Sequence, residues 1–247
     1  MPLTFAHPAA VLPFSRKSKY INFLALVLGS MAPDFEYFLR GMPYGVIGHT
    51  FFGFVFFNLP VIIIVYWTYK KCIHSALYQH LPSILQDCPS DVTKSAGVFK
   101  SFVFLYCAFL GMLTHVVWDA FTHLEGYMVR NLSILSYPVQ ILNYQIPLFK
   151  LLQHGSTITG ITFILGYLYI RAGRSRNNRQ VTASPNQKLI YWGLIALFTI
   201  IFFGLWYLIG EVSIQAYGII VVRIIDAALI GLLIVSLYFK QMNRVKE

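Results

Sequence analysis

The stretch FKSFVFLYCAFLGMLTHVVWDAF, residues 99–121, decides the fold class. It is mostly apolar and long enough to cross a bilayer, which takes about 20 residues of α-helix. Its second half nevertheless carries His115 and Asp119, which are four residues apart and therefore share one helical face. An ionisable side chain inside a membrane helix costs about 2.5–3.5 kcal/mol on insertion scales. We therefore predict a membrane helix that carries part of a functional site near one end.

Five more stretches have similar length and apolar character, and they are residues 20–39, 46–69, 151–170, 189–209 and 218–239. The whole chain of 247 residues is 57% hydrophobic and only 11% charged, whereas soluble domains are about 25% charged. This composition excludes a soluble α/β enzyme and a disordered chain. We predict an all-α polytopic integral membrane protein with about six transmembrane helices and a short N-terminal helix. It forms a single membrane domain over 1–247, in which 1–170 carries the site and 187–239 forms two further spans.

The net charge of +10 indicates topology rather than nucleic-acid binding. Most of the 19 Lys and Arg residues fall in four segments, which are 16–19, 70–100, 171–188 and 240–246. Cytoplasmic loops of membrane proteins collect Lys and Arg. We therefore expect these segments and the C-terminus to be cytoplasmic, with the lipid bilayer and no nucleic acid as partner. His74 and His80 are expected on that cytoplasmic surface.

Polar side chains gather at the opposite ends of the predicted spans. In chain order they are Asp34, Glu36, His49, His115, Asp119, His123 and His154. The predicted topology brings the ends of four spans to one level near the outer face, so these residues are expected to form one site. Residues 136–150, rich in aromatic residues and Pro, are expected to be an interfacial belt or a lid over that site. In the last span, Arg223 and Asp226 are expected to form a structural ion pair.

Imidazole and carboxylate together favour Zn²⁺, Mn²⁺ or Fe²⁺ over Ca²⁺ as the bound ion. Asp34, directly after Pro33, is the expected ligand of the first span. Glu36 or His154 is the expected acid or base, and the alternative for Glu36 is that it binds a second ion. His115 and His123 are eight residues apart, about 12 Å along a helix axis. Either two ions are bound, or one of these two rings faces the substrate or supports a ligand.

His7 can join the site only if the N-terminal segment folds back. A short helix over residues 3–14, turning at 16–19, would return His7 to the outer level. We state this as a hypothesis, because simple topology leaves the N-terminus on the cytoplasmic side.

Several short motifs are similar to a known family. They are Ala6-His7-Pro8, Pro33-Asp34, Gly48-His49-Thr50, the His115–Asp119 pair with Thr122-His123, and LLQHGS at 151–156. Over residues 2–166 the chain resembles domain of unknown function 4184, an uncharacterised bacterial membrane-protein family. It is more distantly similar to the LexA-regulated, membrane-bound metal-dependent hydrolases, although Phe35-Glu36-Tyr37 departs from their Pro-Asp-x-Asp-His motif. The resemblance implies His7, Asp34, His49, His115 and Asp119 as metal ligands and a place in the bacterial cytoplasmic membrane.

The leading functional hypothesis is a metal-dependent hydrolase that acts at the outer leaflet, on a phosphoester of a lipid or envelope precursor. The sequence contains no Gly-rich phosphate loop, no Gly-x-Ser-x-Gly and no HExxH motif. One alternative is a transporter or proton/ion pathway that uses the same His/Asp cluster. Another is a non-catalytic membrane protein.

Overall fold

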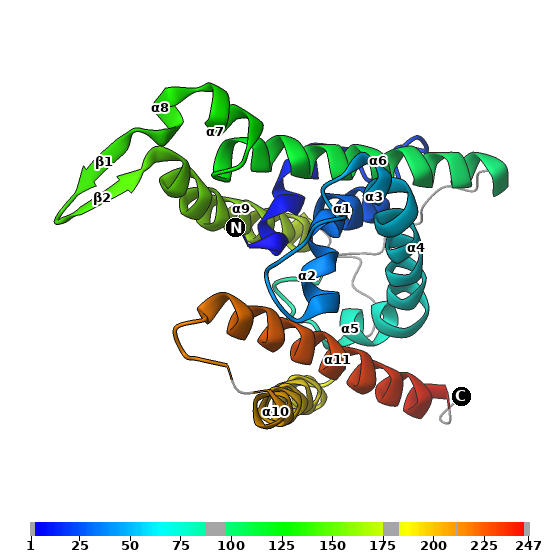
Figure 1. The fold of residues 1–247 in the computed structure, drawn as a ribbon. Helices are drawn as coiled ribbons and strands as arrows, with labels where there is room; N and C mark the ends of the chain where they lie inside the picture. The colour runs from blue at the N-terminus through cyan, green and yellow to red at the C-terminus, as the bar shows by residue number, and fades with distance from the viewer. Residues whose placement is uncertain (1–2, 87–96, 175–182, 211, 245–247) are drawn as a thin grey trace. The chain divides into compact units, whose positions relative to one another are not determined.

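The computed structural model describes residues 3–86, 97–174, 183–210 and 212–244. These residues are mainly helical with one two-stranded sheet (Figure 1), which confirms the all-α class. Four helical segments are long and apolar enough to cross a membrane, and they are Phe51–His80, Val98–Asn131, Pro185–Ile209 and Tyr217–Met242. They match four of the predicted spans. Lys94, Arg176, Arg179 and Lys246, which were counted with the basic segments, lie outside the described residues.

The other two predicted spans have a different character. The stretch 20–39 is divided into α1 (Phe23–Met31), the 3₁₀ turn η2 (Ala32–Asp34) and α2 (Phe35–Arg40). The stretch 151–170 lies in one continuous helix, α9 (Leu148–Arg174), whose several Ser and Thr residues make it less apolar. Neither is among the four apolar segments, so the total number of crossings stays a prediction.

By its contacts the chain divides into two compact units, and the single membrane domain stays a prediction. The first unit comprises Met1–Asp34, Gly48–Ile62 and Pro89–Leu168. It begins with η1 (Thr4–Val11), the predicted short N-terminal helix, which takes 3₁₀ form. In this unit α1 lies along α6 (Gly97–Thr122), as Figure 1 shows. Their shared core is formed by Val11, Ala25, Leu26, Val103 and Cys107.

Two glycines let α1 and α6 approach until their backbones touch. A Cβ on Gly29 would collide with the carbonyl of Ala108, and one on Gly111 would collide with the carbonyl of Leu26. Small residues permit such close contacts between helices in membranes. The contact brings the C-terminal turn of α1 against α6 near His115.

The remaining elements of the first unit precede and follow α6 in the chain. Before the site-bearing α6, the chain forms α3 (Phe51–Gly53), the π-helical turn η3 (Phe54–Asn58) and the start of α4 (Leu59–Thr68). After α6 come α7 (Tyr127–Asn131), α8 (Ser133–Ser136), and the strands β1 (Pro138–Ile141) and β2 (Tyr144–Pro147).

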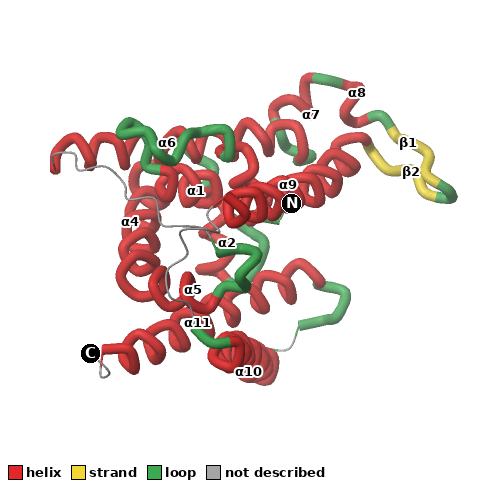
Figure 2. The backbone as a smooth tube through the Cα atoms, turned by 180° about the vertical axis from the view of Figure 1, so that it is seen from behind, coloured by secondary structure: helices red, strands yellow, loops and turns green. Residues whose placement is uncertain are grey.

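The two strands form an antiparallel hairpin, drawn in yellow in Figure 2. Pro138 pairs with Pro147, and Leu142 at the turn has a φ of 52°. Residues 136–150 were predicted to form an interfacial belt or a lid, and no strands were predicted there. The aromatic and Pro content noted there suits a short hairpin better than a helix.

The second unit comprises Phe35–Ile47, Ile63–Cys88 and Tyr169–Glu247. It contains α2, the π-helical turn η4 (Tyr69–Ile73), α5 (His74–His80), α10 (Pro185–Ile209) and α11 (Tyr217–Arg244). Its core is formed by Ala76, Tyr191, Ile195 and Val235. Ser184 caps α10 in a capping box with Gln187.

Two expectations for the second unit are wrong. His80 is not a surface residue, because it is 3% exposed and its ring stacks on Tyr191 at 4.5 Å. Arg223 forms no ion pair with Asp226; its Nη1 donates to the Gly210 carbonyl at 2.8 Å. A helical side chain leans toward the N-terminus of its helix, so Arg223 reaches Gly210, the C-cap of α10, and not the aspartate that follows it in α11.

Candidate metal centre

His115 is the buried centre of the site. It is 0% exposed, and its Nε2 lies 3.1 Å from Oδ2 of Asp119, one turn further along α6. Its Nδ1 lies 2.7 Å from the carbonyl oxygen of Ser30 in α1. A proton on Nδ1 donated to this carbonyl leaves Nε2 with a free lone pair, as is usual for metal-binding histidines. The close contact of α1 with α6 therefore orients the ring.

Asp34 comes to His115 from the η2 turn. Its Oδ1 lies 3.5 Å from His115 Nε2, and its Oδ2 accepts a 2.7 Å hydrogen bond from the Thr4 hydroxyl. Because Thr4 satisfies one carboxylate oxygen, the other remains directed at the imidazole rings. Thr4 and His7 are three residues apart on a 3₁₀ helix, where such side chains lie one above the other.

His49 is positioned by its two neighbours in the chain. A Cβ on Gly48 would collide with the Pro33 carbonyl, so glycine lets this loop approach Asp34 closely. Thr50 is the N-cap of α3 and accepts from the Gly53 amide at 2.9 Å. The Gly48 carbonyl accepts from buried Asn58 Nδ2 at 2.7 Å. His49 Nε2 then lies 3.4 Å from Asp119 Oδ2 and 3.7 Å from Asp34 Oδ1.

These four side chains form a group that can hold a metal ion. Asp34, His49, His115 and Asp119 each offer a ligand atom, and the four atoms lie within 4.8 Å of one another. Among the described residues, Asp34 Oδ1 and His115 Nε2 are buried without a hydrogen-bond partner. Such atoms are rare in folded proteins, because each costs about 1–3 kcal/mol. A divalent cation would satisfy both atoms and neutralise the two carboxylates, so the donor set fits a metal.

Two further histidines face the other oxygen of Asp119. Its Oδ1 lies 3.3 Å from His123 Nδ1 and 3.6 Å from His7 Nε2. The folded-back N-terminus therefore does bring His7 to the cluster. Burial, followed by the neighbouring His115 ring, lowers the pKa of His7 to about 3, so this ring is neutral at physiological pH.

The centre is closed on most sides and open at its edge. His7, Asp34 and His115 are at most 1% exposed, whereas the side chains of His49 and His123 are 31% and 26% exposed. Catalytic metal sites keep an accessible position of this kind for water or substrate. Access to the cluster is therefore from the side of His49 and His123.

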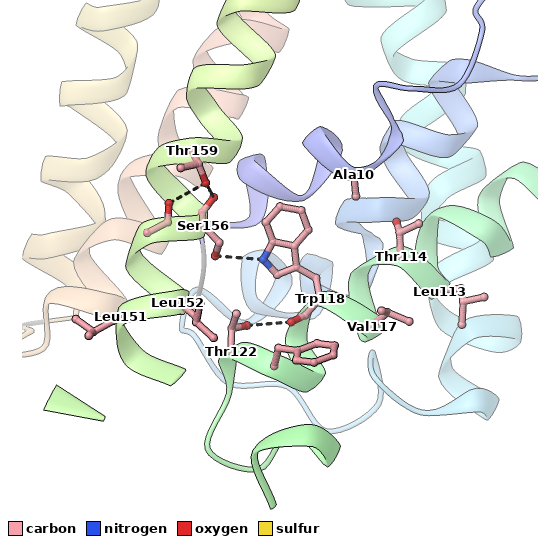
Figure 3. A pocket seen from close by; sticks show the side chains of 12 residues that line it. Ala10, Leu113, Thr114, Val117, Trp118, Thr122, Leu151, Leu152, Ser156 and Thr159 are labelled. Carbon is pink, nitrogen blue, oxygen red and sulfur yellow. Dashed lines mark hydrogen bonds between the residues drawn. The ribbon is translucent and has the colours of Figure 1, made fainter. Parts of the chain in front are cut away.

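An apolar pocket of about 800 Å³ begins beside the centre, between η1, α6 and α9 (Figure 3). Trp118 projects into it and donates from Nε1 to the Ser156 hydroxyl at 3.2 Å. The same indole contacts the His7 ring edge-on, with 5.6 Å between ring centroids. Thr122, another lining residue, has its hydroxyl 3.4 Å from His123 Nδ1. Trp118 and Thr122 are thus shared by the pocket and the histidine cluster.

The two predicted acid–base residues are not part of this cluster. Glu36 belongs to the second unit, where Oε1 accepts from Arg40 Nε at 2.9 Å and Oε2 accepts from the Val46 and Ile47 amides at 2.9 and 2.8 Å. Its carboxylate therefore holds the loop that contains Val46 and Ile47 in place by hydrogen bonds. His154 is exposed on α9, and within the described part of the chain no hydrogen bond or ion pair joins it to the cluster. Their catalytic roles stay predictions that these contacts do not support.

Two groups that orient ligands, Thr4 and the carbonyl of Ser30, were not predicted from the sequence. The position of Thr4, one 3₁₀ turn before His7, was a usable signal. The Ser30 carbonyl carries no side-chain signal, and only the contact of α1 with α6 reveals it.

The fold and the cluster define a helical protein with apolar helices able to cross a membrane and a buried His/Asp group able to hold a metal ion. Residues 1–237 match the family described as Domain of unknown function (DUF4184), and the chain belongs to it. No curated protein and no solved structure matches the chain. The more distant similarity to the metal-dependent hydrolases stays a prediction.

Proposed function

We propose that the protein is a metal-dependent hydrolase of lipid-linked phosphoesters, with Zn²⁺, Mn²⁺ or Fe²⁺ at the His/Asp centre. The observation that carries this proposal is the convergence of buried ligand atoms with no other partner among the described residues, Asp34 Oδ1 and His115 Nε2 above all. A structural polar network would satisfy those atoms by hydrogen bonds. In a metal centre, the same atoms lack hydrogen-bond partners because they bind the ion.

The chemistry follows from the ligand set and its open edge. A bound divalent ion supplies Lewis acidity and lowers the pKa of water toward about 7. The residues of the chain hold the reacting groups in place. Thr4 fixes the Asp34 carboxylate, Ser30 fixes the His115 ring, and the partly exposed His49 marks the side from which the phosphoester enters. In the hydrolysis, the water oxygen bonds to phosphorus, the phosphorus–oxygen bond to the alcohol breaks, and a water proton ends on that alcohol.

The apolar pocket beside the centre supports a lipid substrate. Its volume of about 800 Å³ lies within the range of ligand pockets, about 300–1,000 Å³. The lining hydroxyls already donate within their own helices, Thr114 to the Gly111 carbonyl at 2.7 Å and Thr159 to the Gly155 carbonyl at 2.9 Å. The pocket therefore offers a largely hydrocarbon-like wall, which suits an acyl or prenyl chain. Its continuity with the cluster through Trp118 would place the head group of such a lipid at the metal.

The proposed setting is the bacterial cytoplasmic membrane, with the C-terminus in the cytoplasm and the centre near the outer leaflet. The positions of the basic segments support this topology.

The test is hydrolysis of paired substrates by detergent-purified protein loaded with each of the three metals. We expect release of phosphate or phosphoalcohol from a long-chain lipid phosphoester, and at least tenfold less from a water-soluble ester with the same head group. His115→Ala should abolish the activity, and Asp226→Asn, in the second unit, should keep it. The proposal would be overturned if the wild-type protein were no more active than His115→Ala with every metal and every substrate.

A further inference from the structure

Asp119 presents its two carboxylate oxygens to two different sets of histidines. Oδ2 lies 3.1 Å from His115 Nε2 and 3.4 Å from His49 Nε2. Oδ1 lies 3.3 Å from His123 Nδ1 and 3.6 Å from His7 Nε2. The four-residue group described above uses the first set. The second set comprises Asp119 Oδ1 and the two imidazole nitrogens next to it, of which His123 Nδ1 also lies 3.3 Å from the Asp119 backbone carbonyl oxygen.

The nitrogens of His7 have no other use among the described residues. Its side chain is 1% exposed, and both Nδ1 and Nε2 are buried without a hydrogen-bond partner, as is Asp119 Oδ1. Contact with Trp118 accounts for the packing of the His7 ring but satisfies neither nitrogen. A buried polar side chain with both of its polar atoms unpaired is costly. Its retention here therefore points to a ligand.

The spacing of the histidine rings fits two ions better than one. The His7 and His115 rings are stacked, with centroids 3.8 Å apart and planes at 22°. Rings that bind one ion converge on it, whereas these two lie side by side, each at a different oxygen of the same carboxylate. The ions of two-metal sites are about 3.5–4 Å apart, which matches the spacing of the rings.

The end of α6 explains how His123 can take part. On a continuous helix, His115 and His123 would be too far apart to share an ion. However, α6 ends at Thr122, so helical periodicity does not fix the position of His123. His123, the first residue after the helix, has its Nδ1 beside Asp119 Oδ1. It therefore belongs to the second set of ligands.

We propose that the centre is dinuclear, with a second transition-metal ion held by His7, His123 and Asp119 Oδ1, and with Asp119 bridging the two ions. This inference rests on the proposed metal-dependent function and deepens it. Two-metal sites can bind the attacking and the leaving oxygen of a phosphoester together, so a second ion suits the proposed phosphoester substrate.

Metal stoichiometry and electron paramagnetic resonance test the inference without an activity assay. Purified protein is loaded with Mn²⁺, desalted and measured by elemental analysis. We expect two equivalents in wild type and in the exposed-residue control His74→Ala, and one equivalent in His7→Gln and in His123→Ala. Wild type should give an exchange-coupled Mn²⁺ spectrum and the two variants a single-ion spectrum.

Two results would overturn the bridged pair. One is a single equivalent in wild type that persists in His7→Gln and His123→Ala, which leaves the first ion and the proposed hydrolase standing. The other is two equivalents that neither variant reduces. No bound metal in wild type would contradict the proposed function as well. The spectrum of wild type alone decides the bridge if a variant fails to fold.

Discussion

Asp119 is the residue on which the centre depends, because its carboxylate lies within 3.6 Å of four imidazole rings, those of His7, His49, His115 and His123. The Asp119→Asn variant keeps the shape of the side chain and removes its charge. We expect the affinity for Zn²⁺ to fall by more than the roughly 10–100-fold that follows loss of a group which merely orients a ligand. Competition with a chromophoric chelator in detergent measures the change. Unaltered affinity would remove Asp119 from the ligand set.

Thr4 is predicted to act through Asp34 rather than on the ion. Thr4→Val removes the hydroxyl that donates to Asp34 Oδ2 at 2.7 Å and keeps the branched shape. Metal affinity should fall about 10–100-fold, and Thr4→Ser should restore it. If Thr4→Val and Thr4→Ser bind metal equally well, the hydroxyl does not orient Asp34.

Glu36 is predicted to stabilise the fold rather than to catalyse. Glu36→Gln removes the ion pair with Arg40, in which Oε1 lies 2.8 Å from Nη2, and weakens the bonds from two loop amides. We expect a loss of about 1–3 kcal/mol in the free energy of unfolding with metal content unchanged. Denaturation in detergent, followed by circular dichroism, gives the first quantity and elemental analysis the second. Full stability together with lost hydrolysis would restore the catalytic role.

At the scale of elements, the site depends on backbone contacts that only glycine allows. Gly48→Ala places a methyl group against the Pro33 carbonyl and should displace His49 from Asp34. We expect a lower unfolding temperature and weaker metal binding. Gly155→Ala is the matched control, since a Cβ there meets nothing within 4 Å and alanine favours helix. Equal behaviour of the two variants would show that the Gly48 contact does not position the loop.

The helices and turns that carry the site differ in how well the sequence predicted their contribution. The spacing of His115 and Asp119 was sufficient to place them on one helical face, because helical periodicity is a local property. The hypothesis of a folded-back N-terminus brought His7 to the correct place. The sequence could not show the bond from Thr4 to Asp34 or from His115 to Ser30, since each joins elements distant in the chain. The acid–base roles of Glu36 and His154 came from the predicted level of the span ends, which does not show which way each side chain points, and they stay predictions.

At the scale of the whole molecule, composition was a sound guide to the fold class and a weak one to its details. Hydrophobic content indicated membrane helices, and four described segments have the required length and apolarity. Hydropathy alone could not show that the stretch 20–39 is divided into α1, η2 and α2. The average apolarity of this stretch stays high even though it contains a 3₁₀ turn with Pro33. The hairpin at 138–147 was not predicted, because each of its strands has only four residues and so short a segment carries little periodic signal.

The topology predicted from the basic segments concerns the whole chain. We expect a fluorescent protein fused to the C-terminus to be fluorescent and an alkaline phosphatase fusion at the same point to be inactive, as for a cytoplasmic end. Exchange of the basic residues at 240–246 for Gln should weaken this preference. An active phosphatase fusion on the unmodified chain would reverse the assigned orientation.

The central claim is that the buried His/Asp group holds a transition metal, and elemental analysis of the purified protein tests it most directly. Protein purified in detergent without chelators, from cells grown with Zn, Mn and Fe, is compared with a His115→Ala/Asp119→Ala variant. We predict at least one equivalent of one of these metals in wild type and less than a tenth of that in the variant. Wild-type protein that is folded yet metal-free under every growth condition, and that takes up no metal when dialysed against all three, would contradict the account.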